Sequence, residues 1–185
     1  QRAGVALADV MSGMYAALGI LAAMRHRDLT GIGQHLDIGM LDVQMAVLVN
    51  QSMNYLTTGK APTRMGNGHP NIVPYQYFPA SDGQFILAVG NDAQFRRAMQ
   101  VLGLEAEAAD PRFTTIALRV ANRDALLPLM AERTRTRTVD EWVAAMESVD
   151  VPCGPINTID RVFADPQVKA RGMQLTLAHK RAGEI

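Results

Sequence analysis

Asp9 is the side chain whose type and position suggest chemistry, because this carboxylate stands before a segment rich in glycine and alanine. A carboxylate there can cap a helix, or it can be a nucleophile that faces an open groove. As a nucleophile it attacks an activated acyl group and forms an anhydride, which divides a difficult exchange into easier steps. From the residues alone the capping role is favoured, and the nucleophilic role stays open.

A second candidate is the loop Gly66-Asn67-Gly68. Backbone N–H groups stabilise a developing oxyanion, and glycine allows the backbone to approach the reacting atoms closely. A Gly-x-Gly sequence in a linker is more often a flexible turn. The loop is therefore either a turn or a supplier of hydrogen bonds to an acyl-transfer site.

The remaining reactive side chains predict neither a metal site nor a reactive thiol. The four histidines have no metal-ligand spacing, which favours surface or capping roles. Cys153 lies near two prolines with no neighbouring cation, which favours a packed thiol. Sequence motifs of nucleotide-binding loops and zinc proteases are absent from the 185 residues.

Composition narrows the function classes further. The chain has 18 Lys and Arg against 18 Asp and Glu, and this balance argues against a nucleic-acid partner. An apolar fraction of 48% excludes a disordered chain and fits one or two domains. The single cysteine predicts a cytoplasmic protein. The longest uncharged run, residues 10–24, is shorter than the roughly 20 residues of a membrane span, so no membrane partner is expected.

The elements that must position these residues follow from the apolar periodicity and the turn residues. Asp9 is expected to cap a helix over 9–27, and Asn91 or Asp92 to cap one that ends at Leu102. The segment Ala80-Ser81-Asp82-Gly83 is typical of a hairpin between strands at 75–78 and 84–89. The capping box Thr138-x-x-Glu141 is expected to begin a helix at 139–148. The other expectations are a strand at 35–40, helices at 42–57, 119–133 and 158–163, a non-helical segment at 151–155, a turn at 165–166 and a strand at 173–178.

Taken together, the motifs resemble those of the family III CoA-transferases, which include formyl-CoA transferase, carnitine CoA-transferase and the bile-acid-inducible enzyme. The matching segments run in order along nearly the whole chain: Val5-Ala6-Leu7-Ala8-Asp9, Ser12-Gly13-Met14, Gly19-Ile20-Leu21-Ala22-Ala23, Thr30-Gly31-Ile32-Gly33-Gln34, Val73-Pro74-Tyr75, Asp82-Gly83, Gly90-Asn91-Asp92-Ala93-Gln94-Phe95, Val151-Pro152-Cys153-Gly154-Pro155-Ile156-Asn157, Asp165-Pro166-Gln167 and Arg171-Gly172-Met173.

The resemblance reverses the expectation for Asp9, because it implies that this aspartate is the nucleophile and carries an aspartyl-CoA intermediate. It also implies that Gly66, Asn67, Gly68 and His69 form a mobile lid over the aspartate. The substrates would be an acyl-CoA, most similar to succinyl-CoA, and a carboxylic acid such as a dicarboxylate. No metal or other tightly bound cofactor is expected, and the implied assembly is an interlocked homodimer.

The implied fold is α/β, a fragment of the family III fold with large-domain helices and a small α+β domain that holds a short antiparallel sheet. Residues 1–60 would be the large-domain portion with the nucleophile helix, and 61–74 the linker with the glycine loop. Residues 75–160 would be the small domain, and 161–185 a return segment. Family members are about twice as long, so the chain looks like a part of a longer protein.

Two alternatives remain open. An α-methylacyl-CoA racemase uses the same fold, and its catalytic glutamate would fall near Asp92. The second is a truncated chain without catalytic activity, whose role would be assembly.

Overall fold

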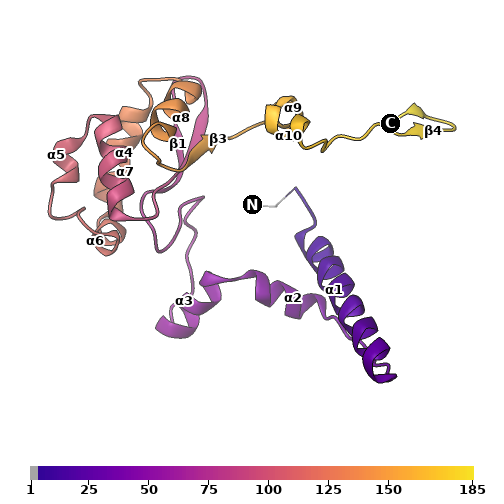
Figure 1. Cartoon of the computed structure of the whole chain (residues 1–185). Helices are drawn as coiled ribbons and strands as arrows, with labels where there is room; N and C mark the ends of the chain where they lie inside the picture. Colours follow the sequence, from indigo (N-terminus) through magenta and orange to yellow (C-terminus); the bar gives the residue numbers. More distant parts are fainter. Residues whose placement is uncertain (1–3) are drawn as a thin grey trace. The chain divides into compact units, whose positions relative to one another are not determined.

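The structure is a computed structural model that describes residues 4–185, and it divides into two compact units. The first unit ends at Arg64 and the second extends from Met65 to Ile185. The elements, labelled in Figure 1, are α1 (Leu7–Thr30), α2 (Met40–Val47), α3 (Asn50–Thr58), β1 (Tyr75–Pro79), β2 (Gln84–Ala88), α4 (Asp92–Leu102), α5 (Glu105–Ala108), α6 (Ile116–Ala121), α7 (Arg123–Thr134), α8 (Val139–Glu147), β3 (Cys153–Pro155), α9 (Ile159–Ala164), α10 (Pro166–Ala170), β4 (Ala178–His179) and β5 (Gly183–Glu184).

Helix α1 confirms the expected first helix but begins earlier than predicted. Its N-cap is Ala6, so the capping role predicted for Asp9 is wrong, and Asp9 lies in the first turn of the helix. A carboxylate in the first turn also interacts favourably with the helix dipole, which is why sequence preferences did not separate the two positions. The helix ends at Gly31, whose φ of 74° is in the left-handed region.

Most residues of α1 are exposed to solvent in this chain. None of its residues is buried, and the large apolar ones include Met14 and Leu18, which are 56% and 65% exposed. The helix is 24 residues long, and an 18-residue window within it has a mean hydropathy of 1.6. By length and composition alone it could cross a membrane, but the core helix of a soluble protein meets the same criteria. The absence of a membrane partner stays a prediction.

Two further expectations for the first unit are wrong. Residues 35–39 do not form a strand, because a strand needs a hydrogen-bonded neighbour and none lies within residues 4–64. The segment packs on α1 instead, where Ile38 lies 3.7 Å from the position that a Cβ on Gly19 would take. The helix expected over 42–57 is divided into α2 and α3 at Val49, whose φ is 47°.

A small antiparallel sheet with strand order β1-β2-β3 organises the second unit. The predicted hairpin is confirmed, with Phe78 opposite Phe85 and a turn closed by a 2.8 Å bond from the Ala80 N–H to the Gly83 carbonyl. Strand β3 pairs with β2, with Cys153 opposite Leu87. This strand was not predicted from the sequence. Its flanking prolines suggested a break, but proline is tolerated on an edge strand.

Helices α4, α7 and α8 cover this sheet and enclose a single core. Phe78, Phe85 and Leu87 of the sheet are fully buried, together with Met130 of α7. Trp142 of α8 is 1% exposed, and its indole N–H donates to the Thr134 carbonyl at 2.6 Å. The indole therefore brings apolar area into the core without leaving its polar atom unpaired.

The core also contains one fully buried charge, the guanidinium of Arg119. It donates to the Val73 carbonyl at 2.7 Å, to the Phe113 carbonyl at 2.9 Å and to Asp92 Oδ1 at 2.8 Å, while it lies 4.3 Å above the centre of the Phe95 ring. Burial lowers the pKa of Arg119, and the bond to Asp92 opposes that shift. The group remains protonated, because an arginine keeps its proton in proteins.

The other helices of the second unit differ from expectation where side chains end them. The Asn91 cap and the capping box of α8 are confirmed. The helix predicted over 119–133 is interrupted at Asn122, whose side-chain amide donates to the Leu118 carbonyl. A turn was expected at 165–166, but Asp165 is the N-cap of the short helix α10. Of the strand expected at 173–178, only residue 178 lies in a strand, β4.

Stability near the start of α8 should depend on the ionisation of Glu141. Bonds from the Thr138 N–H and hydroxyl, at 2.8 and 2.9 Å, hold the pKa of Glu141 below its ordinary value of 4.5. The carboxylate therefore stabilises the fold above that value, and the contribution is lost as the pH falls through the lower folded-state pKa. We expect Glu141→Gln to lose less stability than the parent between about pH 6 and about pH 3 in urea unfolding. Glu184→Gln, which alters an exposed carboxylate, should behave like the parent.

Removal of the buried guanidinium should cost more than neutralisation of its partner. Arg119→Met leaves two buried carbonyls without donors and should lower the free energy of unfolding by about 2–4 kcal/mol. Asp92→Asn keeps an acceptor oxygen on a half-exposed side chain and should cost about 1–2 kcal/mol. Urea unfolding of both variants measures the difference. An equal or smaller loss for Arg119→Met would show that the guanidinium is not the central contact.

Candidate functional site

Asp9 lies in the first turn of α1 with an exposed side chain. The first N–H groups of a helix lack partners within it, so this end carries partial positive charge that favours an anion. A carboxylate nucleophile must be accessible to its acyl substrate. The position of Asp9 meets that requirement, and the side chain is not used to cap the helix.

Ser12 stands three residues after Asp9, a spacing that puts the two side chains on one face of α1. Its hydroxyl oxygen is shielded from solvent and has no hydrogen-bond partner among the described residues. A hydroxyl can both donate and accept, so Ser12 retains unused hydrogen-bonding capacity close to Asp9 in sequence. No functional role for Ser12 follows from sequence reasoning; an unpaired hydroxyl is visible only in a structure.

Both glycines of the loop at 66–69 have structural reasons to be glycine. Gly66 has a φ of 62°, which is in the left-handed region. A Cβ on Gly68 would lie 3.2 Å from Gln76 Oε1 and 3.3 Å from the Met65 carbonyl oxygen. A side chain at either position would therefore strain or displace the loop.

The loop is attached to strand β1. Asn67 Oδ1 accepts a 2.7 Å bond from the Tyr77 N–H, and the His69 N–H donates to the Tyr75 carbonyl at 2.9 Å. The rings of His69 and Tyr75 are stacked at 5.2 Å with an angle of 6° between their planes. A lid movement of this loop would have to break these contacts.

These bonds fix which atoms of two loop side chains act as acceptors. Because the Asn67 oxygen accepts, its exposed amide presents the NH₂ group. His69 Nδ1 accepts from the Asn71 N–H at 3.1 Å, so a neutral His69 carries its proton on Nε2. Both groups are of the kind that stabilises an oxyanion.

Asp9 belongs to the first unit and residues 66–69 to the second. The fold of either unit alone does not bring them together, and their joint action stays a prediction from the resemblance. The domain boundaries at 60, 74 and 160 also stay predictions.

Asp92 accepts from the buried Arg119 at 2.8 Å, and its side chain is 41% exposed. The ion pair gives this carboxylate a structural partner. A general acid or base needs a carboxyl group that can exchange a proton with substrate, whereas this carboxylate oxygen is already bonded to the guanidinium. The contact therefore favours a structural role at the position where the racemase alternative needs a catalytic one.

The packed thiol expected at Cys153 is confirmed. Burial raises the pKa of this thiol, and its sulfur lies 3.6 Å from the Val143 carbonyl oxygen. Thiol nucleophiles need the opposite shift. Within residues 4–185, His, Cys, Asp and Glu side chains do not gather in groups of three or more that could hold a metal ion.

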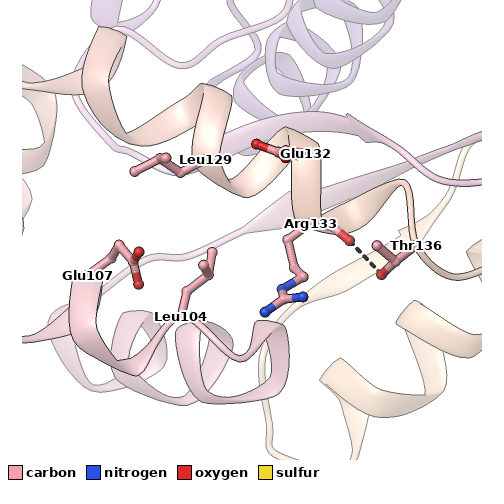
Figure 2. Close-up of a pocket in the computed structure, with 6 residues that line it drawn as sticks. All are labelled: Leu104, Glu107, Leu129, Glu132, Arg133 and Thr136. Atoms are coloured by element: carbon pink, nitrogen blue, oxygen red, sulfur yellow. Dashed lines mark hydrogen bonds between the residues drawn. The ribbon is translucent and has the colours of Figure 1, made fainter.

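A surface groove of about 370 Å³ lies in the second unit. In Figure 2 the Thr136 hydroxyl is bonded to the Arg133 carbonyl, at 2.8 Å. The Arg133 guanidinium donates to the Gly103 carbonyl at the end of α4, at 3.2 Å. The groove thus lies beside a helix-end contact, and its lining includes neither Asp9 nor the loop: Leu104, Glu107, Leu129, Glu132, Arg133 and Thr136.

Comparison with curated proteins identifies relatives of defined activity. The chain is 48% identical over 176 residues to the succinate–glutarate CoA-transferase of Agrobacterium fabrum, covering 95% of this chain and 44% of the relative. It is 36% identical over 184 residues to the human succinyl-CoA:glutarate CoA-transferase, covering 100% of this chain and 42% of the relative. The chain therefore spans less than half the length of these curated relatives.

Solved structures agree with the expected fold. A CAIB/BAIF family protein from Brucella suis is 46% identical with a TM-score of 0.75, and the match covers 100% of this chain and 52% of that protein. A Mycobacterium tuberculosis protein of 22% identity, matched over 100% of this chain and 48% of its own length, has a TM-score of 0.85 and supports the fold alone. The mixed fold of helices and a small antiparallel sheet is confirmed as part of that fold.

The resemblance inferred from the motifs is also confirmed. Residues 1–185 match CoA-transferase family III over their whole length. This chain belongs to CoA-transferase family III.

Proposed function

We propose that this chain carries the nucleophile of a CoA-transferase that moves CoA from a succinyl-CoA-like donor to a dicarboxylic acid. The observation that carries the proposal is the 48% identity to an enzyme named succinate–glutarate CoA-transferase. The exposed carboxylate of Asp9 on the first turn of α1 supports its role as the nucleophile.

The proposed reaction needs only carboxylates and a thioester. An Asp9 oxygen attacks the donor thioester carbonyl, the C–S bond breaks, and CoA leaves as a thiolate from a mixed anhydride. The thiolate attacks the Asp9 carboxyl carbon, which releases the donor acid and leaves an aspartyl-CoA thioester. The acceptor carboxylate attacks that thioester to form a second anhydride. The released thiolate then attacks the acceptor acyl carbon, which regenerates Asp9.

Each of these steps passes through a tetrahedral oxyanion. Hydrogen-bond donors that are fixed in place before the reaction stabilise such an intermediate without reorganisation. The amide of Asn67 and the imidazole of His69 are groups of this kind. Their participation is part of the proposal. No tightly bound cofactor is required, since coenzyme A enters as a substrate.

The proposal extends to assembly and location. The apolar side chains of α1 that are exposed in this chain would be covered in a homodimer, and the single cysteine suits a cytoplasmic protein. Sedimentation of the full product of the gene measures the oligomeric state.

The covalent step predicts that Asp9 becomes labelled. Intact-protein mass spectrometry after mixing with succinyl-CoA should show an adduct on Asp9 that hydroxylamine converts to a hydroxamate. Asp9→Asn removes the nucleophile and should lower turnover about 10³-fold or more, with loss of the adduct. Asp28→Asn, on the last turns of the same helix, should keep both.

The experiment should be run on the 185-residue chain and on the full product of its gene. An adduct on the chain alone excludes the non-catalytic alternative. Label on neither protein would contradict the transferase. Exchange of the α-proton of an acyl-CoA with solvent, without any acceptor acid, would point to the racemase.

Acceptor choice should depend on the second carboxylate. Glutarate and pentanoate have the same number of carbons and differ in one terminal carboxylate. A site that pairs that carboxylate should favour glutarate by at least about tenfold in kcat/KM, because the monoacid leaves polar groups of the site unpaired. Rates of transfer from succinyl-CoA to each acid measure the ratio. Equal rates would remove dicarboxylates from the proposal while leaving CoA transfer in place.

A further inference from the structure

Two arginines of the second unit converge on the backbone that follows the glycine loop. Arg119 and Arg123 are four residues apart, at the end of α6 and the start of α7. Arg119 donates to the Val73 carbonyl at 2.7 Å. Arg123 donates to the Pro70 carbonyl at 2.8 Å and, more weakly, to the His69 carbonyl at 3.4 Å.

The acceptors of these bonds all lie within five residues of chain, immediately after Gly68. That segment has neither helix nor strand structure, so side chains take over part of the hydrogen bonding that regular structure would provide. The bonds bridge 46 and 53 positions in sequence. They therefore join the loop to the helical layer of the unit, independently of its bonds to β1.

Asp92 completes this arrangement from the opposite side. Asp92 Oδ1 accepts a hydrogen bond from Nη2 of Arg119, and the Phe95 ring lies under the guanidinium. With Asp92, Phe113 and Val73 as acceptors, the side chain of Arg119 has no freedom to rotate without losing a bond. The position of the Val73 carbonyl is thereby tied to α4.

We infer that Arg119 and Arg123 are positioning residues that hold the glycine loop at 66–69 in its working position, with Asp92 as the counterion that orients Arg119. The inference rests on the proposed function in one respect, because an effect on turnover requires that the loop take part in CoA transfer. It assigns to Asp92 a task in positioning and none in proton transfer.

The two arginines should differ in their tolerance of lysine. Arg119 serves three acceptors in three directions, which a single ammonium group cannot match. Arg123 makes one short bond to the loop segment, and an ammonium group on a flexible stem can replace it. Arg123 is therefore the better test position, because its removal leaves the buried ion pair intact.

The experiment compares Arg123→Met, Arg123→Lys and the control Arg135→Met in the full product of the gene. Arg135 is exposed at the C-terminal end of α7, and its guanidinium donates to the carbonyl of Ala131, four residues earlier, at 3.3 Å. Hydrogen–deuterium exchange of residues 66–77 reports the position of the loop, and kcat and KM for succinyl-CoA report its effect on the reaction.

We expect the backbone amides of residues 66–77 to exchange about tenfold faster in Arg123→Met than in the parent, while exchange in the α4 and α8 peptides is unchanged. Its kcat should fall about 10- to 100-fold while KM changes less than about twofold, as for a misplaced catalytic group. Arg123→Lys should recover most of both losses, and Arg135→Met should match the parent.

Several outcomes would overturn the inference. Unchanged exchange of residues 66–77 in Arg123→Met would show that the Arg123 bonds do not position the loop. A raised KM with unchanged kcat would show that Arg123 binds the acyl-CoA directly. If the parent enzyme transfers no CoA, the proposed function fails. Faster exchange of residues 66–77 in Arg123→Met would still support the positioning role of Arg123.

Discussion

The guanidinium of Arg119 is enclosed on all sides, and a buried cation is stable only if its N–H donors find acceptors. Those acceptors come from three separate parts of the chain: the Val73 carbonyl after the glycine loop, the Phe113 carbonyl before α6, and the Asp92 carboxylate at the start of α4. The folded second unit must bring all three to one point. The segment after the glycine loop, the segment before α6 and the start of α4 are consequently linked through a single side chain.

This constraint makes the second unit a firm support for the loop at 66–69, for which we propose a role in catalysis. Groups that stabilise an oxyanion act best when they are held in place before the reaction, since no energy is then spent on reorganisation. The loop bearing Asn67 and His69 is bonded to β1 on one side and to Arg123 on the other. The first unit has an exposed carboxylate, Asp9, at the positive end of α1.

Local patterns in the sequence were sufficient for elements that depend on local interactions. The hairpin at Asp82-Gly83, the Asn91 cap and the capping box of Thr138 all involve residues within a few positions of one another. Two elements that depend on a distant partner were predicted wrongly. Strand β3 needs β2 for its hydrogen bonds, whereas the alternating segment at 35–39 finds no strand beside it within residues 4–64.

The same division applies to function. The order of motifs along the sequence determined the family, and with it the expectation that Asp9 is the nucleophile, because a motif is a property of neighbouring residues. Only the tertiary structure decided what Asp92 and Arg119 do. They are 27 positions apart and carry no common motif, yet they form an ion pair at 2.8 Å. Burial and pairing across such separations depend on how the chain packs, and packing is decided by the whole core rather than by any one segment.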